Sequence, residues 1–110
     1  MLLNKEQEYY LFEKLDKYLN NINYKFDEKI IGRYYFSIYY DSDLNKFTYQ
    51  KIYYLGDDLY THHKNIFRSK SCLDNSWTLM SSHYFYYRSL NQVKKHCWML
   101  NHWKKKLIQN

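Results

Sequence analysis

The sequence contains no alanine and no proline, one valine, two glycines and two cysteines. Two isolated glycines, Gly32 and Gly56, cannot form a Gly-rich phosphate loop, and neither belongs to a Gly-x-Ser-x-Gly elbow. Two cysteines, Cys72 and Cys97, are too few for a disulfide framework. We therefore expect reduced thiols, no cofactor and no enzymatic activity.

Long apolar runs are also missing, so we expect no membrane-spanning helix. The first ten residues, MLLNKEQEYY, lack the apolar middle and the small-residue cleavage site of a secretory signal. These absences predict a cytoplasmic protein. A length of 110 residues suits one compact domain, residues 1–110.

Aromatic residues are abundant, with fifteen tyrosines, six phenylalanines and three tryptophans. Lysine, asparagine, isoleucine and tyrosine have AT-rich codons, and alanine, proline and glycine do not. A strongly AT-biased genome therefore explains much of this composition, and tyrosine content alone says little about function.

Charge is distributed unevenly along the chain. Residues 1–74 contain eleven basic and eleven acidic residues, so their formal charge is zero. The whole net charge of +6 lies after Asp74, where no acid occurs. Its carriers are Arg88, Lys94, Lys95, Lys104, Lys105 and Lys106. A basic surface of this kind predicts an anionic partner.

The periodicity of residues 4–22 predicts a helix. Its apolar residues recur at three- and four-residue steps, with Asn4 as N-cap and Gln7 in the capping-box position. We expect this helix to pack on the core.

Residues 29–40 and 46–56 predict a β-hairpin, because two aromatic and β-branched runs flank the turn sequence DSDLN. One face of the first strand would carry Ile30, Tyr34, Phe36, Ile38 and Tyr40. The other would carry Ile31, Arg33, Tyr35, Ser37 and Tyr39. The second face is less apolar, so we expect it to be exposed, with Tyr49 and Tyr53 beside it.

The rest of the chain predicts more strands and a second helix. A third strand is expected at 59–67, and residues 77–88 would form one long or two short strands. Ser89 caps the last helix, with Gln92 three residues on. The expected fold is α+β, an antiparallel sheet of three to five strands with an N-terminal and a C-terminal helix packed on it.

The last helix separates into two sides. We expect a buried stripe with a border at Trp103, formed by Leu90, Val93, Cys97, Leu100, Leu107 and Ile108. The opposite side carries Lys94, Lys95, Trp98, His102, Lys105 and Lys106. A tryptophan among lysines suits a partner contact, since lysines bind anions and an indole stacks or fills a pocket.

Tyrosine and arginine dominate interface hot spots, so the predicted exposed face of the hairpin is a second candidate. The residues expected to bind a partner are therefore Arg33, Tyr35, Tyr39, Lys94, Lys95, Trp98, His102, Lys105 and Lys106.

Metal binding and catalysis are weaker alternatives. Cys97 and His102 lie five residues apart, about 140° around a helix, so they do not converge on one zinc ion. Asp57, Asp58, His62, His63 and Lys64 are ingredients of a metal-dependent nuclease, but a strand would point only some of them to one side.

The function expected from the sequence is therefore non-enzymatic binding. Small AT-biased chains with one basic surface are typical of phages and mobile elements, whose products block host machinery. We expect a protein that engages a host nucleic-acid-handling complex and inhibits it, similar in kind to anti-CRISPR proteins, in the host cytoplasm. The alternatives are a small DNA- or RNA-binding regulator that uses the last helix, and a minimal nuclease around Asp57, Asp58 and His62. A homodimer is compatible with either binding function.

Overall fold

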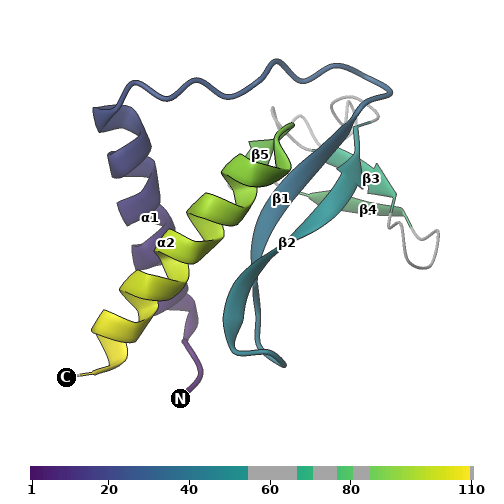
Figure 1. Cartoon of the computed structure of the whole chain (residues 1–110). Coiled ribbons are helices and arrows are strands. Elements are labelled where there is room, and N and C mark those ends of the chain that lie inside the picture. Colours follow the sequence, from purple (N-terminus) through teal and green to yellow (C-terminus); the bar gives the residue numbers. More distant parts are fainter. Residues whose placement is uncertain (55–66, 71–76, 81–84, 110) are drawn as a thin grey trace.

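The computed structural model describes residues 1–54, 67–70, 77–80 and 85–109 (Figure 1). Its elements, in chain order, are α1 (Lys5–Asn21), β1 (Tyr34–Asp41), β2 (Lys46–Tyr53), β3 (Phe67–Lys70), β4 (Trp77–Met80), β5 (Tyr86–Tyr87) and α2 (Leu90–Ile108). The predicted α+β fold is confirmed. No helix in these ranges is long and apolar enough to cross a membrane.

The main sheet has three antiparallel strands in the order β2-β1-β5, and β3 pairs with β4 as a separate antiparallel ladder. Figure 1 shows both helices on one side of the β1–β2 hairpin and the β3–β4 pair on the other. Of the two alternatives predicted for 77–88, one long strand or two short ones, β4 and β5 match the second. The strand expected at 59–67 lies almost entirely outside the described residues, and β3 begins at Phe67.

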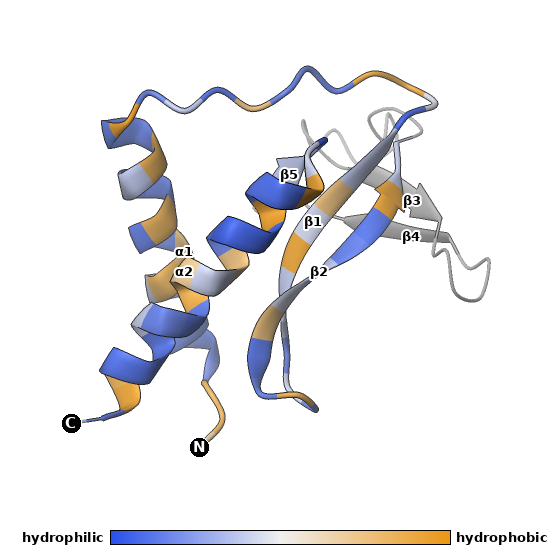
Figure 2. Cartoon of the chain, in the orientation of Figure 1, coloured by the Kyte–Doolittle hydropathy of each residue, from blue (hydrophilic) through white to orange (hydrophobic). Residues whose placement is uncertain are grey.

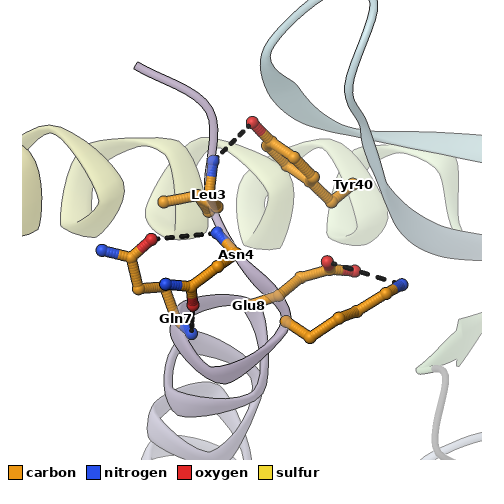
Figure 3. A network of polar contacts seen from close by, with 6 residues as sticks. Leu3, Asn4, Gln7, Glu8 and Tyr40 are labelled. Carbon is orange, nitrogen blue, oxygen red and sulfur yellow. Dashed lines mark hydrogen bonds and ion pairs between the residues drawn. The ribbon is translucent and has the colours of Figure 1, made fainter.

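Helix α1 begins as its sequence predicts. The Gln7 main-chain N–H donates to Asn4 Oδ1 at 2.9 Å, and the Asn4 N–H donates to Gln7 Oε1 at 3.0 Å (Figure 3). This reciprocal pair satisfies two main-chain donors that the first turn leaves without helical partners. One residue earlier, the Leu3 N–H donates to the Tyr40 hydroxyl at 3.2 Å, which attaches the start of α1 to β1.

The hairpin turn DSDLN is held by its own side chains. Asp41 Oδ1 accepts hydrogen bonds from the main-chain N–H groups of Asp43 and Leu44, at 2.9 and 3.2 Å. Asn45 adopts a φ of 51°, in the left-handed region that asparagine tolerates better than most residues. The turn fixes the register of β1 and β2, which pairs Asp41 with Lys46 and Tyr34 with Tyr53.

Strand β1 begins five residues later than the prediction of 29–40. The Arg33 N–H donates to the Ile30 carbonyl at 3.2 Å, which closes a turn, and Gly32 has a φ of 86°. This conformation suits glycine and interrupts an extended strand. Ile30 and Ile31 of this turn are consequently exposed, as is Tyr34 at the start of β1.

The face of β1 that we expected to be exposed is buried at its centre. Tyr35 is 0% exposed and packs with Ile52, Tyr54 and Tyr86. Its hydroxyl donates to the Glu28 carbonyl at 2.7 Å, and the Ile30 N–H donates to that hydroxyl at 2.6 Å. Because these bonds satisfy the phenol, burial costs little, and the segment before β1 closes over this face. The prediction of an exposed face was wrong for Tyr35 and for the buried Ser37.

The opposite face of the sheet packs against both helices. The core there contains Leu11, Leu15 and Leu19 of α1, Ile38 and Phe47 of the hairpin, and Val93 and Leu100 of α2. Phe12 meets Phe47 edge to face at 5.3 Å between ring centroids. The sheet thus has apolar clusters on both faces, and α2 is fixed between α1 and the hairpin.

Helix α2 confirms part of its predicted stripe. Ser89 is the N-cap, and its Oγ accepts the Gln92 N–H at 3.3 Å. Val93, Cys97 and Leu100 are buried, whereas Leu90, expected in the stripe, is exposed because it begins the helix at the margin of the core. His96 and Lys104 are buried, which the sequence did not predict. Hydrophobic and hydrophilic stretches alternate along α2 in Figure 2.

Candidate functional site

The outer face of α2 carries every residue that the sequence placed there. This set, called the α2 face below, is Lys94, Lys95, Trp98, His102, Lys105 and Lys106, and all six are exposed. No acidic residue occurs in α2. The face is therefore cationic along the whole helix, as expected from the charge distribution.

Trp98 is the centre of this face. It is 66% exposed, more than the exposed tyrosines Tyr9, Tyr10 and Tyr34. Its ring lies flat against His102, with centroids 5.3 Å apart and planes inclined by 5°. The residues are four apart on the helix, so their side chains meet on one face. The pair forms an aromatic platform between lysines.

The orientation of Trp98 follows from polar contacts on the inner side of α2. Asn101 bonds the main chain of Phe47 twice: Asn101 Oδ1 accepts the Phe47 N–H at 2.7 Å, and Asn101 Nδ2 donates to the Phe47 carbonyl at 2.9 Å. Lys104 Nζ donates to the Asn45 carbonyl and to Asn45 Oδ1. With Asn101 and Lys104 attached to the hairpin, rotation of α2 is fixed and Trp98 points away from the core.

Two of the six cations in the last third of the chain serve the fold. Lys104 is buried, and desolvation, with the charge of Lys105 second, lowers its pKa. Arg88 Nη1 donates to the Tyr34 carbonyl at 2.8 Å, and the Arg88 N–H donates to Asp27 Oδ2 at 3.4 Å. The four other cations are the lysines of the α2 face.

A buried pair lies under α2 on its inner side. His96 is 1% exposed, and its Nδ1 lies 2.7 Å from the Tyr87 hydroxyl. Burial raises the pKa of Tyr87, so the phenol keeps its proton, and the imidazole tautomer decides which of the two groups donates. Burial first, and Lys95 second, lowers the pKa of His96. Neutral His96 is therefore a structural residue between α2 and β5.

An open groove of about 260 Å³ separates α2 from β2. Its lining residues are Lys46, Phe47, Thr48, Tyr49, Lys94, Cys97, Trp98 and Asn101. Burial raises the pKa of the Cys97 thiol to about 12, so this cysteine is protonated and unreactive as a nucleophile. The groove joins the α2 face to the edge of the sheet, which sequence reasoning did not anticipate.

The second predicted surface is only partly exposed. Tyr35 is buried, while Arg33 is exposed and Tyr39 is half-buried. The register opposes Ile38 to Tyr49 and Tyr34 to Tyr53, which places Tyr49 and Tyr53 on the other face of the sheet from Arg33. The residues predicted for this surface are thus divided between two faces.

The alternative sites fall largely outside the described residues. Asp57, Asp58, His62, His63, Lys64 and Cys72 all lie there. Within the part of the chain that the structure describes, no three His, Cys, Asp or Glu side chains converge as metal ligands. The nuclease interpretation stays a prediction, because the described residues do not test it.

Comparisons with protein-family models, with curated proteins and with solved structures find no match for this chain.

Sequence reasoning did not predict that Asn101 and Lys46 contribute to the groove between α2 and β2. Asn101 lies three residues after Trp98 on the helix, next to the predicted buried stripe, and a side-chain amide at such a border is suited to bond a strand edge. Lys46 begins β2 and lines the groove opposite α2. Neither role follows without knowing that β2 is the edge that faces α2.

Proposed function

We propose that this protein is a non-enzymatic binding protein of the cytoplasm that engages a nucleic-acid-handling complex through the α2 face and inhibits it, in the manner of anti-CRISPR proteins. The observation that carries the proposal is the position of Trp98, exposed on a helix face with four lysines and no carboxylate. An indole in water gains nothing for the fold, whereas at an interface it contributes a large contact area.

Inhibition by binding needs a complementary surface and no catalytic constellation. The lysines would meet phosphates or carboxylates of the complex, and the Trp98–His102 pair would supply the apolar contact at the centre. Direct binding of nucleic acid is a second candidate, favoured by the same platform, since bases stack on exposed aromatic rings beside lysines.

An interference assay in bacteria tests the inhibitory function. Cells that carry an active RNA-guided nuclease and a matching target plasmid would express the protein, in turn for each of a panel of nuclease types. We expect plasmid survival to rise for at least one type. No rise with any type would overturn the inhibitory function.

Matched variants connect the effect to α2. The double variant Lys95→Ala with Trp98→Ala removes one lysine and the exposed indole of the α2 face. The control, Lys17→Ala with Tyr9→Ala, removes an exposed lysine and an exposed aromatic residue from α1. We expect the first to lose protection at equal protein level and the second to keep it. Equal protection by both would show that α2 is not the contact.

A further inference from the structure

Within the described residues, α2 covers the edge of β2 at one residue and leaves the next outward-facing residue without a partner. β2 is an outer strand of the β2-β1-β5 sheet, so every second residue turns its main-chain N–H and C=O away from β1. Phe47 is such a residue, and Asn101 binds both of its groups. The amide of Asn101 therefore occupies the place of a neighbouring strand.

Tyr49 faces the same way as Phe47. The Ile38 N–H donates to the Phe85 carbonyl at 3.3 Å, on the β5 side, so Ile38 and its partner Tyr49 form a pair without hydrogen bonds to each other. In an antiparallel ladder the groups of such a residue point outward. No residue in the described ranges bonds the N–H or C=O of Tyr49, which adjoin the groove.

The groove supplies side-chain contacts beside this open backbone. The groove has a volume of about 260 Å³ and is open to solvent, so a segment of extended chain can cross it. Phe47, Cys97 and Trp98 contribute apolar surface to its lining.

The charge of the groove selects its occupant. Lys46 on β2 and Lys94 on α2 both line it, both are exposed, and no acidic residue is among its lining residues. A basic segment would be repelled, whereas carboxylates would be attracted to either side of the groove. The occupant that fits is an extended acidic peptide with apolar side chains at alternate positions.

We propose that the groove between β2 and α2 binds an extended acidic segment of a partner protein by strand addition to Tyr49. The segment exchanges main-chain hydrogen bonds with Tyr49, places an apolar side chain against Trp98 and directs carboxylates to Lys46 and Lys94. This inference rests on the proposed function and names the part of the partner that the α2 face recognises.

Binding of synthetic peptides to the full chain tests the inference. The probe is a fluorescent peptide of alternating valine and glutamate, about eight residues long, a usual length for a strand. One control peptide has lysine in place of glutamate, and a second carries N-methyl groups on its backbone amides. We expect only the first to bind, with protection of the Tyr49 amide from hydrogen exchange.

Charge variants locate the binding. Lys94→Glu should weaken the acidic peptide about tenfold, because it replaces an attraction with a repulsion at the groove. Lys17→Glu, on α1 and away from the groove, should leave the affinity unchanged. Equal binding of all three peptides, no binding of any, or an unprotected Tyr49 amide would overturn the inference. A dimer that protects Tyr49 without peptide would assign the edge to a second copy instead.

The interference assay separates failure of this inference from failure of the proposed function. Protection that depends on Trp98, together with no peptide binding, would reject the groove alone. Peptide binding at Tyr49 without protection against any nuclease would retain the groove as a peptide site and reject the inhibitory function.

Discussion

Tyr35 and Trp98 are both large aromatic residues that the sequence placed on a binding surface, but they differ in solvent exposure. Tyr35 is 0% exposed and Trp98 is 66% exposed. The Tyr35 hydroxyl finds main-chain partners at Glu28 and Ile30, so the chain folds over it. Asn101 and Lys104 hold α2 to the hairpin in a rotation that leaves Trp98 on the exposed α2 face. Whether an aromatic side chain is exposed therefore depends on hydrogen bonds that neighbouring segments form with it or with its helix.

The largest expected effect separates these two residues by stability. Tyr35→Ala should lower the free energy of unfolding by about 3–5 kcal/mol, because it leaves a cavity in a closed cluster. Trp98→Ala should change it by less than about 0.5 kcal/mol, as surface substitutions do. Urea unfolding of both variants measures the difference. A Trp98→Ala loss as large as that of Tyr35→Ala would make Trp98 a core residue.

Tyr35→Phe sharpens the same comparison, since it keeps the ring and removes the hydroxyl. The Ile30 N–H and the Glu28 carbonyl would lose a partner in a partly buried place. We expect a loss of about 1–3 kcal/mol, the cost of buried groups left without hydrogen bonds. Unchanged stability would show that these bonds do not hold the segment before β1.

Asn101→Leu tests what fixes the orientation of α2. The substitution keeps a side chain of similar size without branching at Cβ, and it leaves the Phe47 N–H and C=O without the Asn101 amide. We expect a loss of about 1–2 kcal/mol in unfolding free energy. We also expect a change in the fluorescence of Trp98 relative to a chain with Asn101 intact. If neither the unfolding free energy nor the fluorescence changes, the Asn101 contact does not fix the orientation of Trp98.

The buried His96 predicts a pH dependence of stability. Its pKa is lowered in the folded chain, so below about 6.5 the unfolded chain binds a proton that the folded chain resists. Stability is therefore complete above that pH and is lost progressively as pH falls toward the lowered pKa. The groups facing the ring are the hydroxyl of Tyr87 and the ring of Tyr24. Unfolding measured at pH 5 to 8 should show the loss, and His96→Gln should reduce it.

The smallest expected effect on stability concerns Ser37. Its side chain lies on the same face of β1 as that of Tyr35, but its substitution should not destabilise the fold. Its hydroxyl is buried and has no hydrogen-bond partner among the described residues. Ser37→Ala should therefore leave the unfolding free energy within about 0.5 kcal/mol and shift it toward greater stability. A clear loss in calorimetry would reveal a partner for this hydroxyl.

Local signals predicted the elements of this fold well. The capping box of Asn4 and Gln7, the DSDLN turn and the Ser89 cap depend on neighbouring residues, and each is present. All six residues predicted for the outer face of α2 are exposed, because helical periodicity and charge agree there. The partner of that face stays a prediction.

Long-range contacts account for the failures. Tyr35 is buried by a segment whose closure depends on the turn at Gly32. Lys104 is buried because the hairpin turn presents oxygen atoms of Asn45 to it. An expectation based on residue type assigns tyrosine and lysine their average exposure. It cannot show which individual side chain forms hydrogen bonds with residues distant in the sequence.

The most direct test of the α2 face is an anisotropy titration of labelled DNA and RNA with the chain and the two double variants. We expect binding at low salt that four lysines make steeply salt-dependent, falling about a hundredfold between 50 and 200 mM salt. Lys95→Ala with Trp98→Ala should weaken it clearly, and Lys17→Ala with Tyr9→Ala should not. Equal binding by both double variants would contradict the account, because the anion-binding surface would then lie elsewhere.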